Sequence, residues 1–176
     1  PVFAFSQIAK IEHLEGSVNT YNADLNFHQV TDTLAYYTLI SEENNYQSSI
    51  YLAVKKDGKW RKSSYTRFNH ETFNTGDICF FNNQAVFSLC DLENNCQLAF
   101  YNQIEIKKIK SINNTGKKNI QGNLTSHNTQ KVLYFVSDRE GGFGGMDIWL
   151  SMIDNNGNFG VPINAGSRIN SSADEI

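Results

Sequence analysis

Short apolar runs alternate with polar turn residues along the whole chain. The clearest run, Val132 to Val136, consists of β-branched and aromatic residues and is typical of a buried strand. A glycine-rich turn follows, and Met146 to Met152 forms a second apolar run. Asn155-Asn156-Gly157 then predicts a tight turn, with a third strand from Phe159 to Ile163. The pattern predicts a meander of antiparallel strands.

The same strand spacing recurs earlier in the chain. Leu34 to Tyr37 aligns with Val132 to Phe135, and Ile50 to Leu52 aligns with Ile148 to Leu150, each at a spacing of about 98 residues. The turn at Asp57-Gly58 aligns with Asn156-Gly157 at nearly the same spacing. A degenerate copy lies between them: its linker is predicted at Asn74 to Asp77, and its strands at Ile78–Phe81, Ala85–Cys90, Gln97–Tyr101 and Ile104–Lys110. The chain is therefore expected to contain three related units.

Composition agrees with an all-β protein. The chain has 176 residues, of which 40% are hydrophobic and 12% aromatic, and its Asn, Ser and Thr residues suit polar turns. The net charge is -3 and the pI is about 5.8, which argues against a nucleic-acid-binding surface. No apolar stretch reaches the roughly 20 residues of a membrane span.

The C-terminal third carries a longer motif. It reads Leu-Tyr-Phe-x-Ser-Asp-Arg-x-Gly-Gly-x-Gly-Gly-x-Asp-Ile from Leu133 to Ile148, followed by a Gly-x-Phe-Gly-x-Pro strand and by Ile169-Asn170-Ser171 to Asp174-Glu175. This run resembles one blade of the TolB-type, WD-repeat-like β-propellers found in envelope proteins of Bacteroidetes, often beside OmpA-like domains. The resemblance covers about a third of the chain closely.

The resemblance implies β-propeller blades, each a four-stranded antiparallel meander. The expected division is a lead-in or the end of a preceding blade at 1–15, blade-like repeats at 16–69, 70–114 and 115–170, and the start of a further blade at 171–176. About three blades do not close a propeller, since roughly four to eight are typical, so the chain is expected to belong to a larger propeller. A small open β-meander domain is the alternative.

Large side chains recur at strand positions where blades would pack face to face. Packing is preferred over a sugar-stacking platform for these aromatic residues, which are Tyr36, Tyr51, Phe87, Phe100, Phe135 and Trp149. Lys107, Lys108 and Lys110 fall in an expected outermost strand, where lysines block association with other sheets. A phosphate or lipid site is the weaker alternative there.

The glycine-rich motif is expected to be structural. Its members are Ser137, Asp138, Arg139, Gly141, Gly142, Gly144, Gly145 and Asp147. The two carboxylates, Asp138 and Asp147, are weak candidates for calcium, but a turn fixed by carboxylates accepting N–H bonds, with Arg139 pairing nearby, is favoured. Asp24, Asp77 and Asp174 are expected to cap the linker turns at blade starts.

No catalytic or cofactor-binding arrangement stands out. The histidines His13, His28, His70 and His127 lack metal-ligand spacing, and neither a Ser elbow nor a phosphate-loop Lys-Ser/Thr is present. Cys90 and Cys96 bracket a short turn, where they would form a disulfide in an oxidising compartment or remain buried thiols, and Cys79 is the odd one out.

The resemblance implies a non-enzymatic interaction module in the periplasm, associated with the outer membrane. It would bind a protein partner and no nucleic acid, without spanning the membrane itself, as an accessory of a type IX secretion or gliding machinery. The alternatives are the propeller domain of a hydrolase or peptidase, and a glycan-binding propeller.

Overall fold

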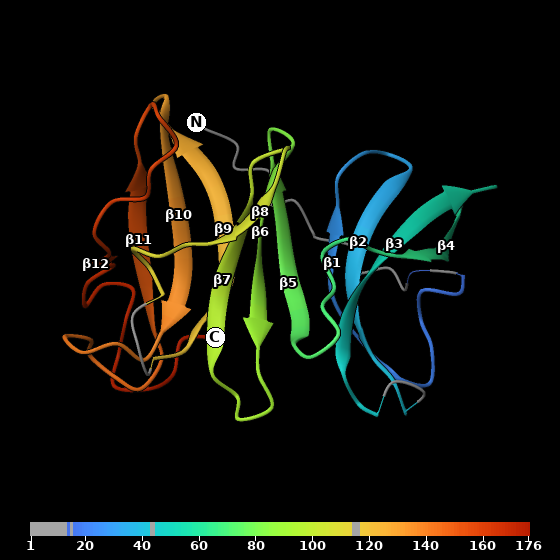
Figure 1. Ribbon diagram of the computed structural model, residues 1–176, viewed down its shortest axis with the longest axis horizontal. Helices are drawn as coiled ribbons and strands as arrows, with labels where there is room; N and C mark the ends of the chain where they lie inside the picture. The colour runs from blue at the N-terminus through green and yellow to red at the C-terminus, as the bar shows by residue number, and fades with distance from the viewer. Residues whose placement is uncertain (1–13, 15, 43–44, 114–116) are drawn as a thin grey trace, which may run out of the picture.

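The computed structural model describes residue 14 and residues 16–42, 45–113 and 117–176. Within these ranges the protein is all-β, and its twelve strands form three four-stranded antiparallel sheets. The sheets follow one another along the longest axis of the molecule (Figure 1). Most of the expected lead-in segment at 1–15, with the apolar run Val2 to Phe5 and His13, lies outside the described residues.

Each sheet is a meander in sequence order. Sheet A consists of β1 (Ala23–Gln29), β2 (Leu34–Ile40), β3 (Ser48–Lys56) and β4 (Lys59–Tyr65). Sheet B consists of β5 (Asn74–Phe81), β6 (Gln84–Cys90), β7 (Cys96–Tyr101) and β8 (Ile106–Lys108). Sheet C consists of β9 (Asn119–His127), β10 (Gln130–Ser137), β11 (Asp147–Ile153) and β12 (Ile163–Asn164).

Two-residue turns set the register of three hairpins. Both turn residues have positive φ at Asp57-Gly58, at Asn82-Asn83 and at Asn128-Thr129. This is the conformation that matches the twist of paired strands, and Asn, Asp and Gly adopt it most easily. The Asp-Gly signal was visible in the sequence, whereas Asn128-Thr129 is a less typical pair, and β9 before it was not located by the hydrophobic pattern.

Two apolar cores lie between the sheets. Sheets A and B enclose a cluster in which Ile50 of β3 joins Phe87 of β6 and Phe68, which follows β4. Sheets B and C enclose a second cluster, in which Val86 and Leu98 of sheet B join Phe135 and Trp149 of sheet C. Because side chains alternate along a strand, neighbouring residues of β6 point into different cores. β5 contacts β1, β2 and β3, and β9 contacts β5, β6 and β7.

The aromatic residues expected to pack between units divide among these cores. Tyr36, Phe87, Phe100, Phe135 and Trp149 belong to, or pack against, the two clusters between sheets. Tyr51 instead packs against a third cluster, which contains Tyr37 and Trp60.

One linker prediction is wrong. Asn74 to Asp77 is the first half of β5, where Asn74, Thr75 and Gly76 pair with Cys90, Leu89 and Ser88. Thr75 and Gly76 are buried between neighbouring sheets, so these polar and small residues read as a turn although they lie in a strand.

The described residues include no helix long and apolar enough to cross a membrane.

Candidate functional site

A groove lined by one strand from each sheet is the main candidate site. β1, β5 and β9 each contribute three consecutive residues to it, and its volume is about 330 Å³. The lining residues are Asn26, Phe27, His28, Asp77, Ile78, Cys79, Gln121, Gly122 and Asn123. We call this the inner groove.

A β-bulge repeats at the inner groove. Asn26, Asp77 and Gln121 each have φ of 53°, and the strand pairing shifts register at each of them. A bulge turns one backbone N–H away from its own ladder. The freed N–H of Asp77 donates to Thr38 Oγ1 of sheet A at 3.3 Å, and that of Gln121 donates to Ser88 Oγ of sheet B at 3.2 Å. Sheets B and C are thus each hydrogen-bonded to the preceding sheet at the same position.

Asp77 lies at the centre of this arrangement. Its carboxylate accepts hydrogen bonds from Asn26 Nδ2 of sheet A and, at 3.0 Å, from Ser88 Oγ of sheet B. Because Ser88 Oγ also accepts the N–H of Gln121 in sheet C, these contacts link all three sheets. Burial raises the pKa of Asp77, and the Ser88 hydrogen bond partly opposes that increase. Asp77 was expected to cap a linker turn, and this expectation is wrong because the residue belongs to the bulge of β5.

Burial shifts the pKa values of two titratable side chains that line the inner groove. His28 Nε2 accepts the backbone N–H of Phe80 at 3.1 Å, and burial lowers the pKa of the imidazole, which favours its neutral form. Burial raises the pKa of the Cys79 thiol, which disfavours the nucleophilic thiolate.

The glycine-rich loop is organised by Asp147. This carboxylate is 1% exposed and accepts the N–H groups of Phe143 at 2.5 Å and Gly144 at 3.2 Å, together with Asn164 Nδ2 at 3.2 Å. A Cβ on Gly142 would lie 1.9 Å from Asp147 Oδ2, so a larger residue cannot take this position without displacing the carboxylate.

The same loop docks the segment at 171–175. A Cβ on Gly144 would come within 2.2 Å of the Ala173 carbonyl oxygen, and one on Gly145 within 2.3 Å of Asp174 Oδ1. Met146 N–H donates to Asp174 Oδ1 at 2.8 Å, and Glu175 N–H donates to the Met146 carbonyl at 2.7 Å. The two motifs that stood out separately in the sequence therefore hold each other in place.

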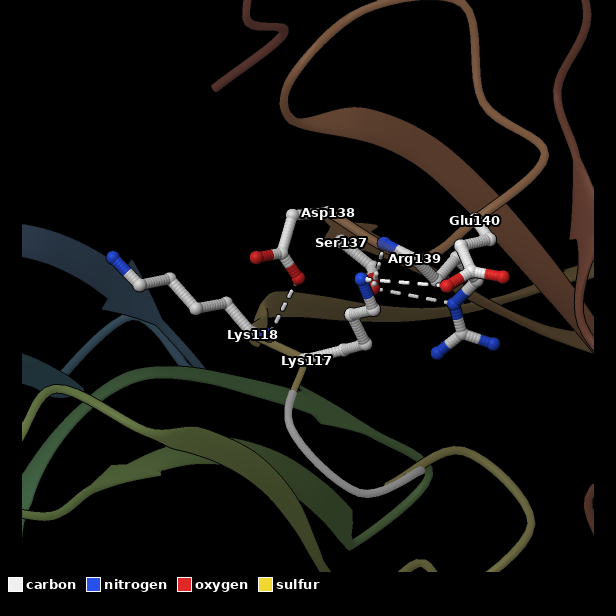
Figure 2. A network of polar contacts seen from close by, with 6 residues as sticks. All are labelled: Lys117, Lys118, Ser137, Asp138, Arg139 and Glu140. Carbon is white, nitrogen blue, oxygen red and sulfur yellow. Dashed lines mark hydrogen bonds and ion pairs between the residues drawn. The ribbon is translucent and has the colours of Figure 1, made fainter.

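Asp138 and Arg139 face different partners (Figure 2). Asp138 Oδ1 accepts the backbone N–H of Lys118 at 2.6 Å, while the Lys118 ammonium group points away from it. Lys117 lies 4.0 Å from Glu140, a pair too exposed to contribute much stability.

Arg139, which follows β10, ties the segment before β9 and the first residue of β9 to the rest of sheet C. Its guanidinium lies against the rings of Phe135 and Trp149, at 4.7 and 5.2 Å from their centroids. It donates to the Ile112 carbonyl at 2.9 Å and to Asn119 Oδ1 at 2.6 Å. Burial lowers the pKa of Arg139 to about 10, which leaves the group charged at neutral pH.

The structure does not support the calcium alternative with a cluster of ligating side chains. Among the residues that the structure describes, no three His, Cys, Asp or Glu side chains gather where they could hold a metal ion. Both Asp147 oxygens face N–H donors, which would repel a cation.

A repeated asparagine clamp was missed in the sequence. Asn69, Asn113 and Asn170 each follow the last strand of a sheet and bind both backbone groups of one residue in the third strand. The partners are Ile50, Leu98 and Ile148, with distances between 2.6 and 2.9 Å. The signal was an apolar residue before each asparagine, in Phe68-Asn69, Ile112-Asn113 and Ile169-Asn170.

Cys90 and Cys96 form a disulfide, whereas Cys79 is a buried free thiol. The turn between Cys90 and Cys96 is built by Asp91, which accepts the N–H groups of Glu93 and Asn95 and the Asn95 side-chain amide. Asp154 builds the same turn with Asn156 and Asn158.

The remaining predicted residues lie apart from the groove. Asp24 accepts Thr20 N–H at 2.6 Å and therefore caps a turn, whereas Asp174 accepts the N–H of Met146 in the glycine-rich loop and does not cap its own linker turn as expected. His70 packs against Phe73, and His127 lies at the exposed end of β9.

Comparison of the chain with protein-family models and with curated proteins gives no match.

Proposed function

We propose that the three sheets are consecutive blades of a TolB-type, WD-repeat-like β-propeller that acts as a non-enzymatic interaction module. The observation that carries this proposal is the bulge repeated in β1, β5 and β9, with its hydrogen bond from one sheet to the next. Sheets that repeat one contact are related by one repeated rotation and translation, which is the way in which blades follow one another.

The outer face of sheet C supports membership of a larger propeller. Tyr134, Met152 and Ile163 lie on the face opposite the Phe135 core and are 38%, 46% and 56% exposed. Tyr36 and Val86 occupy the corresponding places in sheets A and B, where the next sheet covers them. The occupant that fits this face is a further four-stranded sheet of the same kind.

The partner in this proposal is a protein, and its contact surface is the inner groove. Asn26, Gln121 and Asn123 are exposed there, and the carboxylate of Asp77 lies between them. Fixed amides around one partly desolvated carboxylate favour a polar partner segment with a cationic side chain.

The location that goes with this function is the periplasm, beside the outer membrane. The Cys90–Cys96 disulfide supports an oxidising compartment. In that setting the module would serve an outer-membrane complex, such as the type IX secretion or gliding machinery named by the family resemblance.

The test is crosslinking in the native envelope, followed by purification of the full-length protein and mass spectrometry. Three forms are compared: the natural protein, the groove variant Gln121→Lys/Asn123→Lys, and the control Ser63→Lys/Ser64→Lys. The control adds the same charge to exposed positions of β4. Thermal unfolding of all three forms establishes that each one folds.

We expect one envelope protein to be recovered in stoichiometric amount with the natural and control forms and lost with the groove variant. Equal recovery with all three forms would exclude the groove as the contact surface. Recovery of the protein alone, in repeated trials, would exclude the interaction module.

A further inference from the structure

A second groove lies on another part of the surface, where β8 of sheet B faces the turn between β11 and β12 of sheet C. Two adjoining cavities of about 590 and 280 Å³ form it, and they share Gln84, Phe100, Asn156 and Gly157. Their combined size is in the range of small-ligand sites. We call this the lysine groove.

The floor of the lysine groove is aromatic and fixed. Phe100 and Phe159 meet edge to face with their ring centroids 5.1 Å apart. Both rings pack against the core between sheets B and C, so they stay partly exposed in the groove without being able to withdraw from it. Such a floor suits the C–H face of a ring-shaped ligand.

The walls of the lysine groove are cationic, although the whole chain carries a net charge of -3. Four lysines and one carboxylate line it: Lys107, Lys108, Lys110, Lys131 and Asp154. Lys107 pairs with Glu105 at 2.5 Å, and Lys108 lies over the Phe73 ring at 4.8 Å. Within the described part of the chain, Lys110 and Lys131 have neither an ion pair nor a ring contact, and Lys131 Nζ donates to Gln84 Oε1 at 3.4 Å.

The acidic residue in the wall does not cancel this charge. Asp154 accepts the N–H groups of Asn156 and Asn158 and the Asn158 side-chain amide, and these hydrogen bonds lower its pKa. Asp154 therefore stays ionised within its own turn, but one carboxylate does not balance four lysines, and the side-chain amides of Gln84, Asn102 and Asn156 line the groove beside them.

The combination of lysines, amides and aromatic rings favours one class of anionic ligand over the others. A nucleic acid needs a wider basic face than these lysines provide. An acidic peptide added as a strand would need a longer free edge than the three residues of β8. Amides that can bind hydroxyl groups, an aromatic floor and spaced ammonium groups together fit a sugar chain that carries negative charge.

We propose that the lysine groove binds an acidic oligosaccharide. Lys110 and Lys131, with Lys107, contact its carboxylate or phosphate groups, the side-chain amides bind its hydroxyls, and Phe100 and Phe159 contact a sugar ring. This site is separate from the inner groove, so it can be tested whether or not a protein partner binds there.

The test is isothermal titration of the full-length protein with defined probes. Trigalacturonic acid presents carboxylates, a phosphorylated oligomannoside presents phosphates, and maltotriose is the neutral sugar of comparable length. Hexaglutamate and phosphatidylglycerol vesicles represent the competing classes of anionic ligand. The charged sugars distinguish the source of the negative charge.

The matched variants are Lys107→Gln/Lys110→Gln in the groove and Lys55→Gln/Lys56→Gln on β3 of sheet A. We expect one acidic sugar to bind at least about tenfold more tightly than maltotriose, and the groove variant to weaken it about fivefold to tenfold. Affinity should fall as salt is raised, because the contacts are exposed. The control pair should leave it unchanged.

Three results would overturn the proposal. They are equal binding of acidic and neutral sugars, equal losses in the groove and control variants, and tighter groove-dependent binding of hexaglutamate or vesicles than of either acidic sugar. The last result would keep an anion site but reject a carbohydrate ligand. Unfolding curves of each variant ensure that a lost fold is not counted as a lost ligand.

Discussion

The Ser88 hydroxyl on β6 accepts the backbone N–H of Gln121 on β9 at 3.2 Å, joining sheet B to sheet C. The same hydroxyl donates to Asp77 at 3.0 Å. Thr38 holds the corresponding place in β2 and accepts Asp77 N–H. One hydroxyl at one strand position therefore connects each pair of neighbouring sheets.

Replacing Ser88 with alanine should destabilise the sheet stack by about 1–3 kcal/mol, because the Gln121 N–H and an Asp77 oxygen lose a buried partner. Ser88→Thr should retain most of the stability, since Thr38 makes this contact in sheet A. Urea denaturation of the two variants measures the difference. Equal losses in both would show that packing, and not the hydroxyl, determines the effect.

Asp77→Asn should change how stability depends on pH. Burial raises the pKa of Asp77 above its ordinary value of 3.8, so the folded protein binds this proton more tightly than the unfolded chain. The natural protein should therefore lose stability relative to the variant as pH rises from 3.8 through the folded-state pKa. Denaturation midpoints across this range measure the difference.

Asp154→Asn provides a control of opposite sign. Hydrogen bonds lower the pKa of Asp154, so its contribution to stability is present above 3.8 and is lost as pH falls through its folded-state pKa. Parallel pH profiles for the natural protein and Asp77→Asn would contradict the role given to Asp77.

Asn113→Ala should lower the free energy of unfolding by about 2 kcal/mol, because both backbone groups of buried Leu98 lose their partner. Asn113→Asp should be at least as harmful, since a carboxylate cannot donate to the Leu98 carbonyl. Chemical denaturation is the measurement, and Asn155→Ala, at an exposed turn position, is the control expected to change little. An unchanged midpoint for Asn113→Ala would remove the clamp from the list of stabilising contacts.

Gly144→Ala should detach the segment at 171–175 from the glycine-rich loop. The new Cβ would overlap the Ala173 carbonyl, at a cost of about 1–3 kcal/mol if the loop stays in place. Hydrogen exchange of the Met146 and Glu175 amides reports the separation, since both are bonded across this contact. Gly160→Ala, whose Cβ would lie 3.3 Å from its nearest atom, should leave both amides protected.

Hydrophobic patterning revealed much of the fold. The alternation of apolar runs and turn residues located β2, β3, β6, β7, β10 and β11 closely, because these strands are buried on both faces or alternate regularly. The first strands of sheets B and C were harder to predict. β5 begins with Asn74-Thr75-Gly76-Asp77, and β9 has polar residues throughout, since both border the inner groove and carry a bulge.

The candidate sites were also only partly predictable from the sequence. The glycine-rich loop was recognisable because its glycines, Asp147 and Arg139 lie close together along the chain. Its contact with the segment at 171–175 was not predicted, since that contact is made across space. Asn26, Asp77 and Gln121 are three different residue types with no shared local motif, and only the stacking of three sheets brings them to one groove.

The sequence by itself determined an all-β chain of three related units, because strand periodicity and turn chemistry are local properties. Only the tertiary structure decided which side chains meet. Ser88 accepts a hydrogen bond from Gln121, and Arg139 donates one to Ile112. Lys107 and Lys108 of β8 line a groove together with the turn after β11. All of these contacts depend on how one sheet packs on the next.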